Sequence, residues 1–422
     1  MPHYDVIVVG TGPAGNAAAY TLARGGARVA LLEKHTLPRH KTCGGGMPMV
    51  VRDVLAIDVC NDLSPETFVE ADARYMRHTW NFADPCLMPM NPEGSTGESA
   101  RRPLSLWMVQ RSVFDDALAR RAARAGAELR DALPVRVVHT EPGRVRVLAE
   151  GPQGAWEGTA DFLIGADGAN GIVARSVGLR RNRALAIAIE VEVPHRWGDG
   201  HPDLRPDVCH LEYGAVRRGY AWVFPKGNHL NVGAGVFRPR QPDGRGDSTV
   251  RAELHRAIHG YLQALGVPAN PDTLTYHAHP LPIWNGLDTL QTREHRVLLA
   301  GDAAGLINPF FGDGILHALK SGQIAAQCIL NGTTSRYTRA IATEFQANFD
   351  AALRLARFFY QWPGFCYRHG VKRPGATHTA TRLLCGEAMF QDIATRVMRR
   401  IREAMRADRT ASDAALSLDE TN

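Results

Sequence analysis

Short apolar runs rich in β-branched residues lie in the N-terminal half of the chain and again near residue 300. They are 5–10 (DVIVVG), 28–34 (RVALLEK), 161–165 (DFLIG) and 296–301 (RVLLAG). Segments of helical composition follow the first and the last of these runs. Short strand-like runs that alternate with helices are typical of a sheet buried between helices. The pattern therefore predicts an α/β domain.

A different pattern occupies residues 180–288, where apolar and polar positions alternate. The strand-like stretches are 184–193 (ALAIAIEVEV), 209–214 (CHLEYG), 219–225 (GYAWVFP) and 229–237 (HLNVGAGVF), and one helical segment follows at 248–266. Alternation with a period of two residues is typical of a strand with one buried face. We expect an antiparallel sheet covered by a helix.

The C-terminal part has helical composition from Tyr337 to Arg406, interrupted by prolines and glycines at 362–375. Aromatic residues gather in 357–370 (RFFYQWPGFCYRHG). A lid over an apolar substrate, a membrane-facing surface and packing on the first domain are all compatible with this cluster.

Together these patterns predict a discontinuous division into domains. The first domain comprises 1–77, 108–180 and 291–335, the sheet domain comprises 78–107 and 181–290, a helical region spans 336–406, and a loose tail spans 407–422.

The turn after the first strand contains Gly10, Gly12 and Gly15 in the spacing GxGxxG. In this spacing the first glycine forms the turn, the second lets the backbone approach a pyrophosphate, and the third allows close packing of helix on strand. The helix N-terminus then faces the phosphates. Glu33 ends the second strand, where an acidic side chain binds a ribose hydroxyl. These features predict a dinucleotide site.

Composition narrows the class of protein further. The chain has 422 residues, 45% of them hydrophobic, and a formal net charge of +6, which is typical of a globular protein of two or three domains. No run reaches the roughly 18 apolar residues of a membrane span, and the first strand begins at Tyr4, so we expect a cytoplasmic protein without a nucleic-acid partner. The arginine-rich run 396–409 is compatible with a solvated helix face, with peripheral contact at the inner face of an anionic membrane, and with a phosphate-bearing substrate.

Cysteine and histidine positions argue against a metal site. The seven cysteines include no CxxC pair, which indicates reduced thiols. His277 and His279 alternate along a strand, but no carboxylate or cysteine accompanies them at ligand spacing, so we expect no metal. Cys43 precedes three glycines in 41–47 (KTCGGGM), where a ligand that approaches the backbone, a mobile loop and a simple turn are each compatible with the run.

Residues 161–170 (DFLIGADGAN) and 296–330 resemble flavoprotein motifs of the p-hydroxybenzoate hydroxylase superfamily. The resemblance implies FAD, with Asp302 on its ribityl chain, Gly312 and Gly314 opening a helix toward the pyrimidine edge of the flavin, and Arg111 along the cofactor. A helix N-terminus there favours the anionic reduced flavin. The expected cofactor-binding residues are Gly10, Gly12, Pro13, Ala14, Gly15, Glu33, Lys34, Cys43, Gly44, Gly45, Arg111, Asp167, Gly168, Gly301, Asp302, Pro309, Gly312, Asp313, Gly314 and Ile315.

Residues 220–235 (YAWVFPKGNHLNVGAG) and 38–46 (PRHKTCGGG) resemble motifs of the geranylgeranyl reductase family. With the two flavoprotein motifs, the resemblance covers about residues 4–335. It implies an α/β and α+β fold, in which a Rossmann-like FAD-binding domain of the p-hydroxybenzoate hydroxylase type is interleaved with an antiparallel-sheet substrate domain and followed by C-terminal helices. In this family the loop containing Cys43 lies beside the flavin ring.

The resemblance also implies reduction of carbon–carbon double bonds of a polyprenyl diphosphate or polyprenyl lipid. Hydride from reduced flavin must then be matched by a proton, in a pocket shielded from water. Cys43 is our first candidate for the proton donor or relay, and Tyr220 is the second. Tyr220, Trp222 and Phe224 share one face of a strand, where they form either the wall of an apolar tunnel or a core stripe. The expected substrate-binding residues are Tyr220, Trp222, Phe224, Pro225, Gly233 and Gly235.

The electron donor and the head group of the substrate stay open. No second GxGxxG follows a strand, so the donor is expected to be transiently docked NADPH or a reduced protein carrier of the ferredoxin type. For a diphosphate head group, Arg217, Arg218 and Lys226 are candidate cations at the tunnel mouth, although charges at strand ends are more often simply solvated.

Two other functional classes are compatible with the sequence. The superfamily includes hydroxylases and halogenases, which combine reduced flavin with oxygen, and residues 219–225 are similar to the halogenase pattern Gly-Trp-x-Trp-x-Ile-Pro except at Tyr220 and Phe224. The third class is a flavin-binding redox sensor or lipid carrier. In the loop 309–314 (PFFGDG), Asp313 stands where reductases of this type have glutamate in PLTGEG. Because of this departure, the loop motif predicts the fold but does not identify the substrate.

Overall fold

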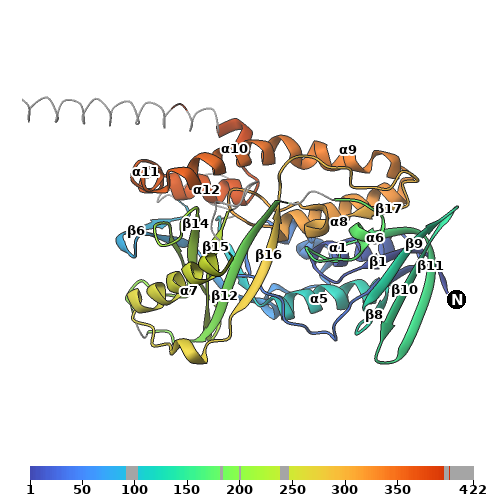
Figure 1. Ribbon diagram of the computed structural model, residues 1–422, viewed down its shortest axis with the longest axis horizontal. Coiled ribbons are helices and arrows are strands. Elements are labelled where there is room, and N and C mark those ends of the chain that lie inside the picture. The colour runs from blue at the N-terminus through green and yellow to red at the C-terminus, as the bar shows by residue number, and fades with distance from the viewer. Residues whose placement is uncertain (92–102, 181–183, 199–200, 238–246, 394–398, 400–422) are drawn as a thin grey trace, which may run out of the picture.

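The computed structural model describes residues 1–91, 103–180, 184–198, 201–237, 247–393 and 399. Apart from Arg399, the arginine-rich run 396–409 and the expected tail 407–422 lie outside the described residues. These described residues form three sheets with helices around them (Figure 1).

The first sheet contains the dinucleotide motif and has the strand order β8-β2-β1-β11-β10-β9, with β17 paired to β11. Strands β8, β2, β1, β11 and β17 pair in parallel, whereas β11, β10 and β9 form an antiparallel meander. The strand bounds are β1 His3–Val9, β2 Val29–Leu32, β8 Glu128–Arg130, β9 Val135–Glu141, β10 Arg144–Gly151, β11 Gly154–Gly165 and β17 Val297–Leu299. The continuous apolar runs of β1 and β2 follow from burial on both faces.

Three helices pack beside this sheet. They are α1 (Pro13–Arg24), α5 (Arg111–Arg124) and α8 (Ile315–Leu330). Helix α8 approaches α1 so closely that a Cβ atom at Gly322 would lie 2.0 Å from the carbonyl oxygen of Ala14. This contact packs the N-terminal end of α1 against the middle of α8, and the two helices lie side by side in Figure 1.

The second sheet has the strand order β16-β12-β15-β14-β13-β5-β6 and is antiparallel except for the pair β13 and β5. The strand bounds are β5 Tyr75–Trp80, β6 Ala83–Pro89, β12 Ala184–Pro194, β13 Val208–Glu212, β14 Gly219–Pro225, β15 His229–Val236 and β16 His277–Ile283. Helix α7 (Asp247–Ala264) covers one face, where Leu254 and Ile258 lie in one core cluster with Val191, Val223 and Val232. The expected alternation of side chains between two faces is therefore present in residues 180–288. The face of the sheet that is not covered by α7 is available to a ligand.

A small third sheet of β3 (Gly46–Pro48), β7 (Leu106–Val109) and β4 (Val69–Ala73) lies beside short helices. These helices are α2 (Val51–Val54) and α3 (Ile57–Cys60), whereas the short helix α6 (Val173–Ser176) packs with the first sheet. Strand β5 starts at Tyr75, so it crosses the boundary expected at 77/78, and β7 belongs to the third sheet rather than the second. The proposed division into domains is otherwise still a prediction.

The C-terminal helices lie across both large sheets, along the top of Figure 1. They are α9 (Tyr337–Ile341), α10 (Ala347–Gln361), α11 (Pro363–Cys366) and α12 (Ala376–Leu384). In α10, Phe349 packs into the core of the first sheet, whereas Leu353 and Tyr360 pack with residues of the second. Within the described residues, no helix is both long and apolar enough to cross a membrane.

Candidate active site

One cavity of about 1350 Å³ extends from the GxGxxG turn to helices α10 and α12. Ligand pockets usually measure roughly 300–1,000 Å³, so this volume leaves room for a dinucleotide and a second molecule. The end near the first sheet contains charged and backbone groups. The other part is mainly apolar and is lined by Met76, Cys209, Leu211, Tyr220, Trp222, Phe224, Phe237, Leu281, Ile283, Ile307, Phe310, Phe311, Leu355, Phe358, Phe359, Leu383 and Leu384, among others.

The three glycines of the GxGxxG turn occupy different environments. A Cβ atom at Gly15 would lie 1.8 Å from the carbonyl oxygen of Gly10, so the third glycine permits the tight turn into α1. A Cβ atom at Gly12 would have no neighbour within 4 Å, because this residue faces the cavity. No side chain caps the N-terminus of α1. The open side of Gly12 and the uncapped helix end fit the phosphates of a dinucleotide.

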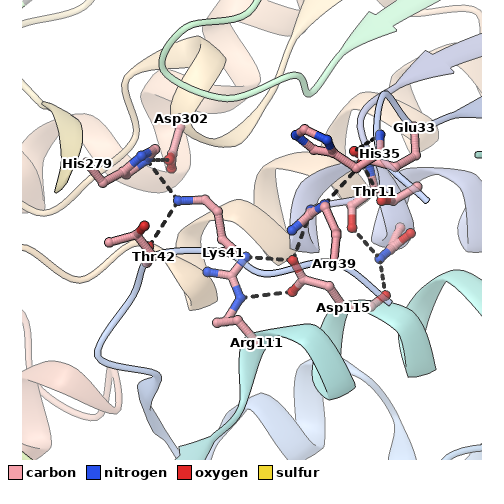
Figure 2. Close-up of polar contacts among 11 residues, drawn as sticks. Thr11, Glu33, His35, Arg39, Lys41, Thr42, Arg111, Asp115, His279 and Asp302 are labelled. Atoms are coloured by element: carbon pink, nitrogen blue, oxygen red, sulfur yellow. Dashed lines mark hydrogen bonds and ion pairs between the residues drawn. The ribbon is translucent and has the colours of Figure 1, made fainter. Parts of the chain in front are cut away.

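A network of charged residues holds the acidic end of the second strand beside this turn (Figure 2). Glu33 accepts hydrogen bonds from the backbone and the hydroxyl of Thr11, at 3.1 and 2.5 Å, and pairs with Arg39 at 3.3 Å. Burial acts to raise the pKa of Glu33, but Arg39 and Thr11 hold it below its usual value. Arg39 also pairs with Asp115 at 3.1 Å, and its Nη1 is buried without a hydrogen-bond partner among the described residues. A phosphate oxygen would satisfy this donor.

A second charged group lies on the opposite side of Figure 2, around Lys41, which precedes the Cys43 loop. Lys41 Nζ donates to His279 Nε2 at 2.8 Å, and this nitrogen lies 3.9 Å from Asp302 Oδ2. Burial acts to raise the pKa of Asp302, but His279, Lys41 and Arg111 hold it below its usual value. Burial lowers the pKa of Lys41 and of His279. Lys41, His279 and Asp302 therefore form one connected polar group in the cavity lining.

The triple glycine after Cys43 packs against the aromatic strand β14. A Cβ atom at Gly44 would lie 2.9 Å from the ring of Phe224. Gly45 has φ of +70°, and its Cβ position is 2.1 Å from the carbonyl oxygen of Val109 and 2.5 Å from Lys226 Nζ. The close approach of backbone to β14 and β7 therefore excludes side chains at both positions.

Lys226 is a buried anchor of this loop and does not lie at a solvent-exposed mouth. Its Nζ donates to the carbonyl oxygens of Gly44 at 2.7 Å and Val109 at 2.8 Å, and the residue is 1% exposed. Burial lowers its pKa to about 8. The expectation that Lys226 waits for a diphosphate, or is simply solvated, is wrong because backbone carbonyls take its hydrogen bonds. Arg217 and Arg218 lie outside the lining of the large cavity.

The aromatic strand and the Gly-x-Gly strand are cross-strand partners. In the β14–β15 ladder, Trp222 lies opposite Gly233, and Tyr220 lies opposite Gly235. A Cβ atom at Gly233 would lie 2.1 Å from the indole ring of Trp222, so the ring lies directly on the glycine. Tyr220, Trp222 and Phe224 all face the cavity, while Ala221 and Val223 between them pack under α7. The expected shared face is thus present, and it forms a cavity wall.

We expect Gly233→Ala to displace Trp222 and to destabilise the fold by about 1–3 kcal/mol through overpacking. Gly227→Ala, in the hairpin that joins β14 to β15, is the matched control, because its Cβ would have no neighbour within 4 Å. Thermal unfolding and the indole fluorescence of each variant test this. Equal unfolding temperatures and identical fluorescence for the two variants would refute the contact.

Tyr220 has its hydroxyl proton engaged. The hydroxyl donates to the carbonyl oxygen of Phe311 at 2.7 Å, and burial raises the pKa of Tyr220. Because this carbonyl belongs to the PFFGDG loop, Tyr220 ties β14 to the loop before α8. The geometry favours a positioning role for Tyr220 and leaves Cys43 as the stronger of the two candidate proton donors.

Glu190 is a buried carboxyl in the cavity wall that our sequence analysis missed. It is 2% exposed, and its Oε1 accepts the backbone N–H of Cys43 at 2.6 Å. Burial raises the pKa of Glu190 to about 7, against the opposing effects of Cys43, Asn231 and Lys226. Asn231 in turn accepts the indole N–H of Trp222 at 2.9 Å. Glu190 is therefore linked to the cysteine loop and to the aromatic strand.

The structure brings most of the expected site residues to the same cavity. All the expected cofactor-binding residues except Gly15 line it, as do Tyr220, Trp222, Phe224 and Gly235. Gly15 and Gly233 lie beneath other backbone or side-chain atoms, and Pro225 ends β14 outside the lining. Gly233 therefore shapes the wall rather than contacting a ligand.

Sequence reasoning missed Arg39, Lys41 and Glu190, and considered His279 only as a metal ligand. A carboxylate within the apolar run 184–193 was the available signal for Glu190, because a buried charge usually has a partner. Arg39 and Lys41 flank His40 in the PRHKTCGGG stretch and had no pattern of their own. The C-terminal lining residues also gave no individual signal.

Comparisons with known proteins agree with this architecture. The family model described as FAD binding domain matches residues 3–322. The chain is 31% identical over 353 residues to the chloroplastic geranylgeranyl diphosphate reductase of Oryza sativa subsp. japonica, covering 78% of this chain and 67% of the relative. It is 29% identical to digeranylgeranylglycerophospholipid reductase 1 of Methanopyrus kandleri, covering 84% of this chain and 90% of the relative.

One solved structure has the same fold over almost the whole chain. It is a geranylgeranyl bacteriochlorophyll reductase-like protein from Thermoplasma acidophilum, with a TM-score of 0.70, 22% identity and 96% coverage of both chains. These findings confirm the family resemblance and the fold class expected from the sequence motifs. This chain belongs to the geranylgeranyl reductase family of FAD-dependent oxidoreductases, within the p-hydroxybenzoate hydroxylase superfamily.

Proposed function

We propose that this protein uses FAD to reduce carbon–carbon double bonds of a polyprenyl chain. The observation that carries the proposal is the continuity of the cavity, which joins the dinucleotide cradle to an apolar compartment at the Cys43 loop. A polyprenyl chain is apolar and long, and it fits a compartment walled by aromatic and aliphatic side chains. Relatives named for geranylgeranyl diphosphate and digeranylgeranylglycerophospholipid support the same substrate class.

The residues present fit FAD along the length of the cradle. Gly12, Arg39 and the N-terminus of α1 would hold the phosphates, and Glu33 would face the adenosine ribose. At the other end, Gly314 caps α8 without a side-chain hydrogen bond, so the positive end of this helix faces the cavity. Reduced FAD bound there would supply a hydride. Its own electrons would come from NADPH or from a reduced protein carrier.

The chain's own residues exclude water and provide the proton. An isolated alkene has no carbonyl group to polarise, so protonation must accompany hydride addition in a dry pocket. Trp222 and Phe224 shield the cavity side of the Cys43 loop. Tyr220 fixes the Phe311 carbonyl and so holds the bulky loop 309–314 against the compartment. We propose that Cys43, whose Sγ accepts the backbone N–H of Gly45 at 3.4 Å, passes the proton to the substrate carbon.

For Cys43→Ser we expect reoxidation of the reduced flavin by substrate to slow by about 100-fold, the lower range for loss of a general acid. FAD content and chemical reduction of the flavin should be unchanged, because the smaller hydroxyl keeps the packing of the loop. Cys60→Ser is the control, because the Cys60 thiol lies outside the cavity lining. Cys209→Ser is unsuitable, because the Cys209 thiol also lines the cavity. An unchanged rate in Cys43→Ser would remove Cys43 from the proton path.

The function is tested under anaerobic conditions. The flavin is reduced chemically, geranylgeranyl diphosphate, a geranylgeranylated phospholipid or a polyprenyl quinone is added, and flavin absorbance is followed. Reoxidation by a polyprenyl compound supports the proposal, and the compound that works best identifies the head group. If the flavin stays reduced with all three but reacts with oxygen to give a hydroperoxide absorbance, oxygenase or halogenase chemistry replaces the proposal.

A further inference from the structure

The wall of the cavity contains a buried carboxyl group that the proposed chemistry has not yet used. Glu190 lies in the middle of β12 and shares the cavity-facing side of this strand with Ala186 and Ala188. The alternate residues Ile189 and Val191 pack under α7 instead. A glutamate that shares a face with small apolar residues lies inside the compartment and not at its solvent-exposed rim.

Three structural elements meet at this carboxyl group. The backbone N–H of Cys43 donates to Glu190 at 2.6 Å. A side-chain hydrogen bond with Asn231 on β15 acts to lower the pKa of Glu190. Asn231 is oriented by the indole N–H of Trp222 at 2.9 Å. The residue bonded to Glu190 is thus Cys43, the proposed proton donor, which also lines the cavity. No other acid in the described cavity lining bonds to the Cys43 backbone.

We propose that Glu190 is the source of the proton that Cys43 passes to the alkene, a role that rests on the proposed function. Reduced FAD would supply the hydride with its electron pair, and one C–H bond would form as the π bond breaks. The second C–H bond forms as the Cys43 S–H bond breaks. The S–H bond then re-forms as the Glu190 O–H bond breaks, and solvent returns a proton to Glu190 after the product leaves. FAD is oxidised by two electrons and the alkene is reduced by two.

The surrounding charges are compatible with a neutral carboxyl at working pH. Burial has the largest effect and raises the pKa of Glu190 to about 7. Glu192, two residues along the same strand, acts in the same direction, while Lys226 at the end of β14 opposes it. On β16, His277 is the cross-strand neighbour of Glu190, and its ring contacts that of His40 in a tilted arrangement, with 4.3 Å between ring centroids. Glu190 therefore keeps its proton below about pH 7 and loses it above.

The test compares Glu190→Gln with Glu190→Asp and with Glu192→Gln. Glutamine resembles the protonated side chain in shape and charge, so Glu190→Gln should fold. Glu192 is the matched control, because it lies on the same strand, outside the cavity lining, and accepts the amide of Gln110 at 3.2 Å. Single-turnover reoxidation of chemically reduced flavin is measured anaerobically with the best polyprenyl substrate from about pH 5 to about pH 9.

In the wild type we expect the rate to be constant below about pH 7 and to fall tenfold per pH unit above. In Glu190→Gln the reoxidation rate at low pH should be at least about 100-fold lower than in the wild type. This rate should no longer change near neutral pH, and the substrate affinity should be unchanged. Glu190→Asp should keep a break at a shifted pH. Glu192→Gln should keep the low-pH rate, with the break moved slightly down, because one negative charge is removed.

A second readout does not depend on turnover. Infrared difference spectra of protein containing ¹³C-labelled glutamate, recorded across the same pH range, should show one carboxyl that ionises near pH 7 and is missing in Glu190→Gln. Absence of this band, or a Glu190→Gln variant with the rate and pH break of the wild type, would overturn the proposal while leaving the proposed function intact. A wild-type flavin that no polyprenyl compound reoxidises would overturn the proposed function itself, and this proposal with it.

Discussion

Gly12→Ala is expected to weaken FAD binding strongly while leaving the fold of the apoprotein intact. A Cβ atom at this position meets nothing within 4 Å in the protein, and φ of −74° with ψ of 178° is accessible to alanine. The methyl group would instead occupy the space through which the pyrophosphate approaches the backbone of the turn. We expect FAD affinity to fall by at least about 100-fold, which corresponds to about 2.7 kcal/mol.

Flavin content after purification and calorimetric titration of apoprotein with FAD measure this effect. The unfolding free energy of the apoprotein should stay the same or rise by about 0.4–1 kcal/mol, because alanine restricts the unfolded chain. Gly227→Ala is the matched control, since its Cβ is equally free of neighbours but lies outside the cavity lining. A Gly12→Ala variant that purifies with a full complement of FAD would contradict the placement of the phosphates.

Lys226→Met is expected to destabilise the protein by about 3 kcal/mol and to disorder the cysteine loop. The ammonium group donates to the carbonyl oxygens of Gly44 and Val109, and each buried carbonyl left without a donor costs about 1–3 kcal/mol. Removal of a buried charge offsets part of this cost. Because Gly44 follows Cys43 directly, the variant should also lose most of its capacity to reoxidise reduced flavin with substrate.

Chemical unfolding of both proteins at several pH values gives the measurement. Unfolded lysine keeps its proton up to about pH 10.4, whereas the buried Lys226 has a pKa of about 8. The unfolded state thus binds more protons between these values, and the stability of the wild type relative to Lys226→Met should rise as pH increases from about 8 to about 10. Lys320→Met removes only a partly exposed ion pair to Glu344 and should change stability by less than about 1 kcal/mol. Equal stabilities of the two variants would refute the buried anchor.

Local sequence patterns correctly predicted those strands and turns whose structure is determined by residues close in sequence. The apolar runs, the GxGxxG turn and the alternation of residues 219–225 each depend on contacts within a few residues or along one strand. The pairing of Trp222 with Gly233 could also be anticipated as a motif, although the physical reason, a ring lying on a glycine, appears only in the ladder.

Roles that depend on distant contacts could not be predicted in the same way. Lys226 binds the carbonyl of Gly44, 182 residues away, and Glu190 binds the amide of Cys43, 147 residues away. Considered alone, a lysine after Phe-Pro resembles a solvated strand end, and a glutamate in an apolar strand resembles an edge position. Only the juxtaposition of β12, β14 and the cysteine loop shows that one side chain anchors the loop and the other can supply a proton.

The most direct test of the account is the mass of the product formed in deuterium oxide. Chemically reduced protein is mixed anaerobically with geranylgeranyl diphosphate in deuterated buffer. The molecular mass of the extracted lipid is then measured by mass spectrometry. Both the flavin hydride and the Glu190 and Cys43 protons exchange with solvent, so the account predicts two deuterium atoms for each double bond lost. Recovery of unlabelled starting lipid with a fully reduced flavin, for this substrate and for the phospholipid and quinone, would contradict it.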